Sequence, residues 1–188
     1  RALWGKSNLY EESAGIPLII AGEGIPEGKI SSTTTSLLDS YQTIMDGLGV
    51  ELTVEEQGLK GESWLKIVNS PDNPDRIVFS EYHAVASPSG AFMLRKGKYK
   101  LVHYVGYDPE LFDLHADPEE TKNLAGKSNY AAVLDELEEC LRTICDPDET
   151  DRQAKDDQNA LIEKYGGPEK AIHMGPKSAT PVPGQSEE

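Results

Sequence analysis

The apolar residues in the first half of this chain follow two patterns, one typical of buried strands and one of amphipathic helices. Residues 16–22 form a continuous apolar run that ends at a glycine, which predicts a strand buried on both faces, as in a parallel sheet. Apolar side chains at helical spacing over 37–48 predict a helix with Asp39 or Ser40 at its N-cap. Residues 51–75 are polar and contain glycine and prolines, which indicates a surface excursion.

A series of short β patterns follows in the second half. The stretch 77–83 begins with β-branched and aromatic residues, and 91–104 has the pattern of a hairpin with a glycine at its turn. Residues 110–114 predict one more short strand. Apolar residues then recur at helical spacing over 130–145, and a proline at the following Asp-Pro pair ends the pattern. The sequence therefore predicts several short strands and then a helix.

The C-terminal residues are strongly polar. Residues 148–165 predict a second helix with few apolar anchors, and the chain from Gly166 onward is rich in glycine, proline and serine. We expect this tail to be extended. The pattern divides the chain into three parts, residues 1–75, 76–147 and 148–188.

Composition excludes several classes of protein. The chain has 188 residues, is 37% hydrophobic and carries a formal net charge of -15, which is typical of a globular domain and not of a disordered chain. The acidity argues against nucleic-acid partners and against anionic membrane surfaces. The longest apolar run falls short of the roughly 20 residues that a membrane span needs.

The two cysteines, Cys140 and Cys145, are too few for a disulfide framework. On a helix through both, they would lie on different sides, so we expect free thiols that are partly packed. They also lack the histidines or further cysteines at ligand spacing that a zinc site requires. The cysteines therefore predict neither a disulfide nor a metal centre.

Several blocks of sequence follow one another in a fixed order: RALWGKSNLYEES at 1–13, IPLI at 16–19, the segment 36–49, RIVFSEY at 76–82, MLRKGKYK at 93–100 and ELFDLHADPEETKNLA at 110–125. Together these blocks resemble the C-terminal portion of the type I sulfatases, which belong to the alkaline phosphatase superfamily. The resemblance covers about residues 1–145 and is strongest to arylsulfatase-like and choline-sulfatase-like members.

The resemblance implies an α/β fold. Residues 1–75 would supply the last strands and helices of a large mixed-sheet sandwich, residues 76–147 a small antiparallel sheet packed on a helix, and 148–188 a polar helix and an extended tail. In the family, a formylglycine made in a Cys-x-Pro-Ser-Arg motif attacks the sulfur, and a divalent cation, usually calcium, binds the sulfate oxygens. Neither cysteine here lies in such a motif. We therefore expect the nucleophile and the cation ligands upstream of this chain, and the chain alone to be inactive.

Two residues are candidates for the site. Lys6 matches the family's lysine that contacts the substrate sulfate, where an ammonium stabilises the charge that develops as the S–O bond breaks. His83 ends a predicted strand, where it could bind substrate or shape its pocket. The alternatives are a solvated surface lysine and a hydrogen-bonded structural histidine.

The acidic residues do not predict a metal site in this chain. Asp113, Asp117 and Glu119 resemble a carboxylate cluster, but in the family this segment is a structural turn. The adjacent Glu11 and Glu12 point apart on a helix or a strand, which favours salt bridges over acid–base catalysis.

The implied partners are a sulfate ester substrate, the missing N-terminal half of the same protein and, through the C-terminal tail, a second copy of the protein. Two other functions stay open: a phosphonate or phosphate ester hydrolase of the same superfamily, and a non-catalytic acidic interaction module. The resemblance is compatible with the bacterial cytoplasm and with the periplasm.

Overall fold

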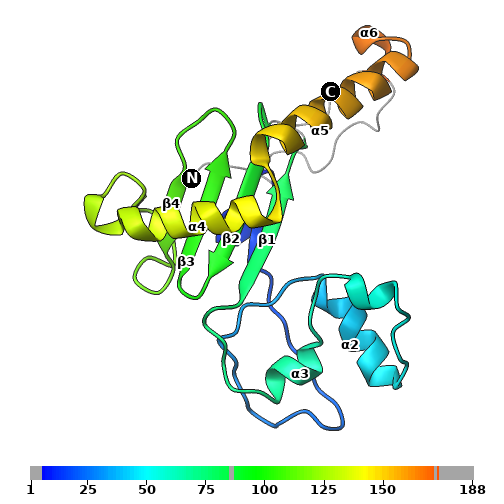
Figure 1. Cartoon of the computed structure of the whole chain (residues 1–188), viewed down its shortest axis with the longest axis vertical. Coiled ribbons are helices and arrows are strands. Elements are labelled where there is room, and N and C mark those ends of the chain that lie inside the picture. The colour runs from blue at the N-terminus through cyan, green and yellow to red at the C-terminus, as the bar shows by residue number, and fades with distance from the viewer. Residues whose placement is uncertain (1–5, 85–86, 172, 174–188) are drawn as a thin grey trace, which may run out of the picture.

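The computed structural model describes residues 6–84, 87–171 and 173, and its centre is a four-stranded antiparallel sheet (Figure 1). The strands lie in chain order β1-β2-β3-β4. They are β1 Ile77–Tyr82, β2 Ala91–Lys96, β3 Tyr99–Tyr104 and β4 Glu110–Asp113. The helices are α1 Glu11–Ala14, α2 Asp39–Leu48, α3 Trp64–Val68, α4 Ala131–Ile144, α5 Pro147–Lys164 and α6 Pro168–Ala171, with single 3-10 turns η1 at Glu56–Gly58 and η2 at Ser128–Tyr130. This is the antiparallel sheet beside a helix that the sequence predicts.

The hairpin between β2 and β3 sets the register of the sheet. Gly97 has φ +55°, a left-handed conformation that glycine adopts without steric cost, and a Cβ there would lie 3.1 Å from the Pro74 carbonyl oxygen. The tight turn pairs Leu94 with Leu101. Because side chains alternate across a strand, this register places one apolar set on each face of the sheet.

Helix α4 covers one face. Phe92, Leu94 and Leu101 of the sheet pack with Leu137 and Leu141 of α4, and all of these side chains are buried. Figure 1 shows α4 lying across this face. The helical spacing of the apolar residues in 130–145 therefore points them at the sheet, as an amphipathic helix requires.

The opposite face is covered by the residues around α1. Leu9 is buried and packs on Ala91, Met93 and Val102. The N-terminal segment thus lies across β2 and β3, although more than 80 residues separate them in sequence. This contact gives the sheet two buried faces instead of one.

The segment 16–22 is not a strand in this structure, so that prediction is wrong here. It has no regular secondary structure, and Ile16 is 54% and Ile19 91% exposed. A strand forms by backbone hydrogen bonding to a neighbouring strand, and in the described part of the chain no strand pairs with this segment. Its apolar side chains therefore face solvent.

Helices α2 and α3 form a separate small lobe below the sheet in Figure 1. A buried ion pair holds it: Asp39 Oδ1 lies 2.6 Å from an Arg76 nitrogen and accepts the Glu62 N–H at 2.9 Å. Helix α2 begins at Asp39, so this residue follows the N-cap Leu38 instead of forming it. The helix ends at Gly49, which takes φ +65°. The apolar stripe of α2 is largely exposed, with Ile44 at 58%.

Helix α5 projects away from the sheet, and none of the described helices is long and apolar enough to cross a bilayer. Asp146 caps α5 by accepting the N–H groups of Asp148 and Glu149. The short helix α6 follows where the sequence predicts an extended chain. The remaining tail, and with it the predicted intersubunit arm, lies outside the described residues.

Candidate functional site

Lys6 lies at the exposed start of a segment that is pinned to the sheet a few residues later. Lys6 and Ser7 are exposed, whereas Leu9 is only 5% exposed. Asn8 Oδ1 accepts the Tyr10 N–H at 3.0 Å, and the Tyr10 carbonyl accepts the Ala14 N–H at 2.8 Å. These local hydrogen bonds favour a turn and then one turn of helix. The lysine is therefore exposed, and the chain is held on the sheet from Leu9 onward.

A buried ionic cluster fastens this segment to the sheet. Lys100 on β3 has no exposed surface, and its Nζ lies 2.9 Å from Glu11 Oε1 and 2.8 Å from Glu120 Oε1. The Glu11 N–H donates to Glu120 Oε2 at 2.7 Å, and Arg95 lies 3.4 Å from the second Glu11 oxygen. Two carboxylates and two cations balance each other, which offsets the cost of removing the charges from water. Glu11 thus has the salt-bridge role that the sequence favours.

The same cluster explains one unusual backbone conformation. Glu120 has φ +49°, and it is the one positive φ outside glycine among the described residues. A left-handed conformation is unfavourable for a side chain with a Cβ. The ion pair with Lys100 and the hydrogen bond from Glu11 hold Glu120 in place. The turn before it closes with a hydrogen bond from the Glu120 N–H to the Asp117 carbonyl oxygen.

A second polar cluster lies beside the first on the same face of the sheet. The hydroxyl of Tyr10 lies 2.9 Å from both carboxylate oxygens of Glu110, and the hydroxyl of Tyr104 lies 2.9 Å from one of them. Burial, together with the negative charge of Glu110, raises the pKa of Tyr104 well above its ordinary value. Tyr104 therefore stays a neutral donor at physiological pH.

His83 directly follows β1, as predicted, and its ring is largely enclosed. The side chain is 19% exposed and its ring meets Phe92 edge-on at 5.2 Å between centroids. Neither ring nitrogen makes a hydrogen bond with the described residues; Nε2 lies 3.7 Å from Glu81. A Cβ on Gly90 would lie 2.8 Å from the ring, so glycine is needed there. The ring is packed against the sheet but lacks the hydrogen bond of the structural alternative, and a role in substrate binding stays a prediction.

The loop that carries His83 is also held by α5. Asp151 Oδ1 accepts the Gly90 N–H at 2.6 Å, and Gln158 donates to the His83 carbonyl oxygen at 2.9 Å. Lys155 lies 2.7 Å from the other Asp151 oxygen. In the described part of the chain no hydrogen bond or ion pair joins His83 to Lys6.

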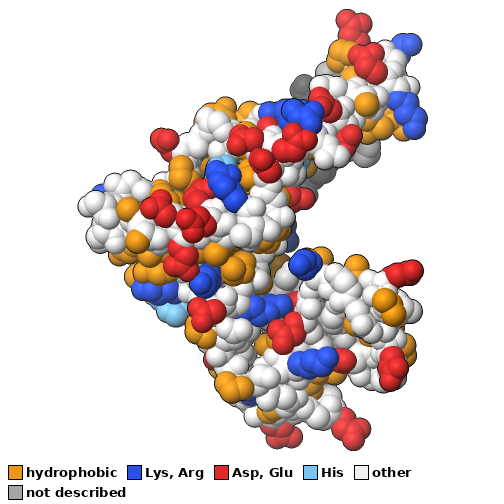
Figure 2. Space-filling model, in the orientation of Figure 1, with side chains coloured by type: hydrophobic (Ala, Val, Ile, Leu, Met, Phe, Trp, Pro, Cys, Tyr) orange, Lys and Arg blue, Asp and Glu red, His pale blue; other side chains and the backbone are white. Residues whose placement is uncertain are grey.

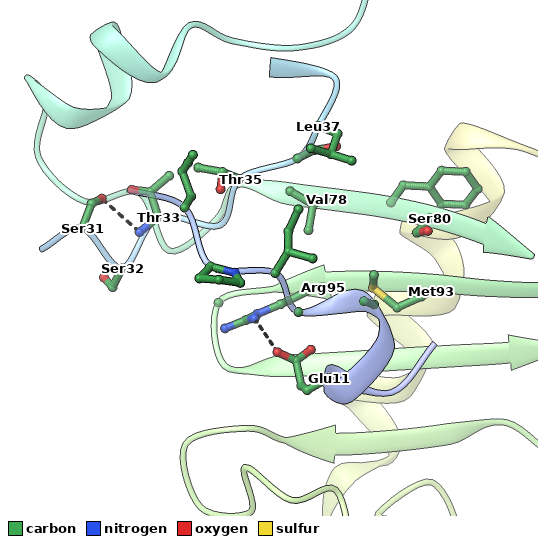
Figure 3. Close-up of a pocket in the computed structure, with 18 of the residues that line it drawn as sticks. Glu11, Ser31, Ser32, Thr33, Thr35, Leu37, Val78, Ser80, Met93 and Arg95 are labelled. Atoms are coloured by element: carbon green, nitrogen blue, oxygen red, sulfur yellow. Dashed lines mark hydrogen bonds and ion pairs between the residues drawn. The ribbon is translucent and has the colours of Figure 1, made fainter. Parts of the chain in front are cut away.

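A cavity of about 810 Å³ opens between the sheet and two chain segments, residues 11–18 and 31–37 (Figure 3). Val78, Ser80 and Met93 form its sheet wall, and Thr35 and Leu37 face them from the chain before α2. Neither Lys6 nor His83 is among its described lining residues.

The cavity is a poor anion site because its arginine and lysine are already paired. Arg95 meets Glu11, as the dashed line in Figure 3 shows, and Lys98 lies 2.7 Å from Asp113. The remaining wall is mainly apolar and hydroxyl-bearing. It is better suited to contact with protein than to binding a charged sulfate.

The carboxylates of Asp113 and Asp117 accept hydrogen bonds from the backbone of their own turn. Asp113 accepts the N–H groups of His115 and Ala116, and Asp117 accepts from the backbone and hydroxyl of Thr121. Burial opposes ionisation of Asp113, but Lys98 and the two N–H groups outweigh it and hold the pKa below its ordinary value. The described residues contain no group of three or more potential metal ligands. Asp113 and Asp117 are thus engaged by the backbone of this turn.

Both cysteines are free thiols and partly buried, as expected. Burial raises the pKa of the Cys145 thiol, which disfavours the reactive thiolate. No motif in the sequence singles out Lys100, Glu120, Tyr10 or Glu110 as a site residue. A usable signal existed for one of them: Lys100 lies two residues before Val102 and therefore on the same buried face.

Comparison with known proteins shows which family this chain matches. The model for the C-terminal part of N-sulphoglucosamine sulphohydrolase matches residues 1–146. Choline-sulfatase from Rhizobium meliloti is 43% identical over 126 residues, which cover 66% of this chain and 24% of that protein. Arylsulfatase K from Danio rerio is 33% identical over 149 residues, covering 75% and 28%. The chain thus spans about a quarter of the length of these curated relatives.

Solved structures show the same architecture. A 2-O GAG sulfatase is 29% identical with a TM-score of 0.55, covering 74% of this chain and 30% of that one. A phosphonate monoester hydrolase from Silicibacter pomeroyi is 25% identical with a TM-score of 0.60, also covering 74% and 30%. These matches confirm the resemblance inferred from the sequence blocks. The chain therefore belongs to the sulfatase family, whose C-terminal domain its residues 1–146 match.

Proposed function

We propose that this chain is part of an enzyme that hydrolyses sulfate esters, in which Lys6 contacts the sulfate. The single observation that carries the proposal is the placement of Lys6. It is exposed, and the residues just after it are fixed to the sheet by the Lys100 cluster and by Leu9. An ammonium held in this way can stabilise the negative charge that develops on the sulfate oxygens.

The formylglycine nucleophile and the divalent cation are proposed to lie outside this chain. The carboxylates of Asp113 and Asp117 are occupied by backbone N–H groups, and no metal-binding group occurs among the described residues. These donors do not fit a calcium site. Calcium, if the complete enzyme uses it, would be held by other residues of that enzyme.

The rest of the enzyme is proposed to cover the exposed apolar residues of 16–59. The matched relatives are about four times as long as the aligned region, and the exposed apolar side chains gather in the first third of this chain. Ile16, Leu18 and Leu37 line the cavity while remaining at least 42% exposed. Apolar surface of this kind is normally buried against a partner.

Replacing Lys6 tests the proposed role. In the complete enzyme, Lys6→Ala should lower kcat on an aryl sulfate about 10²–10³-fold, because one charge-stabilising donor is lost. The melting temperature should not change, because Lys6 is exposed. Lys60→Ala, which removes another exposed lysine, is the control and should leave kcat unchanged. A normal kcat for Lys6→Ala would show that Lys6 is a solvated surface lysine.

A second candidate function is the hydrolysis of phosphonate or phosphate esters. The observation that favours it is the phosphonate monoester hydrolase from Silicibacter pomeroyi, with its TM-score of 0.60. Measuring kcat/KM of the complete enzyme on matched aryl sulfate and aryl phosphonate monoesters distinguishes the two. Turnover of neither would favour the acidic interaction module instead.

A further inference from the structure

Two tyrosines meet on one carboxylate where the Lys6 segment joins the sheet. The hydroxyls of Tyr10 and Tyr104 both lie 2.9 Å from Glu110 Oε2, and Tyr10 also reaches Oε1. Tyr104 and Glu110 belong to β3 and β4, whereas Tyr10 belongs to the segment that begins with Lys6. The Tyr10 hydroxyl is therefore a direct polar link between that segment and the sheet.

We propose that Tyr10 is a positioning residue for Lys6, and that its hydrogen bond to Glu110 fixes where the ammonium meets the sulfate. The inference rests on the proposed function, in which Lys6 contacts the substrate. Tyr10 acts through the backbone, because its hydroxyl is engaged by the carboxylate and its carbonyl starts α1.

Geometry limits how far Lys6 can move once this anchor is in place. The buried Leu9 lies three positions after Lys6, and an extended chain of that length spans at most about 10 Å. Lys6 and Ser7 are themselves exposed. The position of the ammonium therefore depends on how the residues from Leu9 onward are held on the sheet.

The Tyr10 bond is the anchor that can be removed with least disturbance of the sheet. Leu9 contributes apolar contact, which has no preferred direction. Lys100 and Glu120 have no exposed side-chain surface, and Lys100 holds Glu120 as well as Glu11, so changing this cluster alters the sheet itself. A hydroxyl that donates to a carboxylate is directional and charge-assisted. The edge of the Tyr10 ring on Phe112, at 6.1 Å and 62°, stays in place when only the hydroxyl is removed.

Two matched variants of the complete enzyme test the inference. Tyr10→Phe and Tyr104→Phe each remove one hydroxyl that donates to Glu110, but only the first belongs to the Lys6 segment. We expect Tyr10→Phe to lower kcat on an aryl sulfate about 10- to 100-fold with KM nearly unchanged, because a small displacement of a charged group is costly in rate. Tyr104→Phe should keep kcat within about twofold, and the two melting temperatures should shift alike.

A double-mutant cycle with Lys6→Ala shows whether Tyr10 acts through the lysine. Tyr10→Phe should have no further effect on kcat once Lys6 is alanine. Equal loss of kcat in the two phenylalanine variants, or a full additional loss in the Lys6→Ala background, would overturn the positioning role. If Lys6→Ala itself keeps normal kcat, the proposed function of Lys6 fails and the inference fails with it. If Lys6→Ala loses activity while the tyrosine variants behave alike, only the inference fails.

Discussion

Lys100 shows how neighbours decide the environment of a single residue. A lysine is among the residues least often found fully buried, yet this side chain has no exposed surface. Lys100 lies on the same face of β3 as the buried Val102, and its ammonium pairs with Glu11 and Glu120. The two glutamates are 109 positions apart, so the pattern of residues around Lys100 gives little sign of them. Only the fold assembles the cluster.

Removing the charge of Lys100 should therefore destabilise the protein strongly. In Lys100→Met, Glu11 and Glu120 would face each other without the buried ammonium, and Arg95 beside Glu11 would be the remaining cation of the cluster. The expected cost is about 3–5 kcal/mol in the free energy of unfolding. Lys66→Met is the control, because Lys66 is 67% exposed and pairs with Asp46 at 3.4 Å. That surface pair should contribute less than about 1 kcal/mol. Urea-induced unfolding measures both, and equal midpoints would mean that the cluster is not stabilising.

Helix α5 illustrates at the element scale how a polar helix can be fixed in place. It has few apolar anchors, and an isolated polar helix of this kind is marginal in water. In the structure Asp151 and Gln158 fasten it to the backbone of Gly90 and His83. The docking depends on a carboxylate that is only 6% exposed. The attachment of α5 should therefore depend on pH.

Burial opposes ionisation of Asp151, but hydrogen bonds from Lys155 and the Gly90 N–H outweigh it and hold the pKa below its ordinary value. A lowered pKa in the folded state gives stability that is present above the ordinary value, about 4, and lost as pH falls below it. In Asp151→Asn, we expect faster hydrogen exchange of α5 amides at pH 7 and a smaller difference from the unchanged protein below about pH 4. Asp157→Asn, an exposed change in the same helix, should have no effect at either pH. A difference that grows in acid would contradict this assignment.

At the scale of the whole molecule, the large exposed apolar residues gather in one part of the chain. Figure 2 shows acidic side chains gathered over α4 and α5, with a hollow between this body and the lobe of α2 and α3. The large exposed apolar residues cluster instead between 16 and 59: Ile16, Leu18, Ile19, Ile30, Leu37, Leu38, Tyr41, Ile44, Leu48, Val50, Val54 and Leu59. The acidic face can remain in water, whereas the apolar region is the part that the rest of the enzyme is proposed to cover.

Two polar substitutions at equal exposure distinguish a covered region from a free one. Ile16 is 54% and Leu161 53% exposed in this chain. In the chain alone, Ile16→Gln and Leu161→Gln should both leave the melting temperature nearly unchanged. In the complete enzyme, Ile16→Gln should destabilise by about 1–3 kcal/mol, since a polar amide would replace a buried apolar side chain. Leu161→Gln should remain neutral. Equal effects of both in the complete enzyme would show that Ile16 is not covered.

Local rules were enough to predict much of this protein. The alternating strands around Gly97, the helix over 131–144 and its end at Asp146-Pro147 depend on neighbours within a few residues. Such interactions are short-ranged, so the sequence alone predicts them. The free thiols also follow the sequence-based expectation.

The tertiary structure decided everything that needs a distant partner. Residues 16–22 have the composition of a buried strand but stay irregular and exposed, because strand hydrogen bonds require a neighbouring strand and a helix supplies its own. The stripe of α2 likewise predicts the helix but not what it packs against. Lys100 and Tyr10 acquire their roles from Glu120 and Glu110, each 20 or more residues away. Sequence determines what an element can form by itself, and tertiary contact decides which charges are buried and which apolar faces are left for a partner.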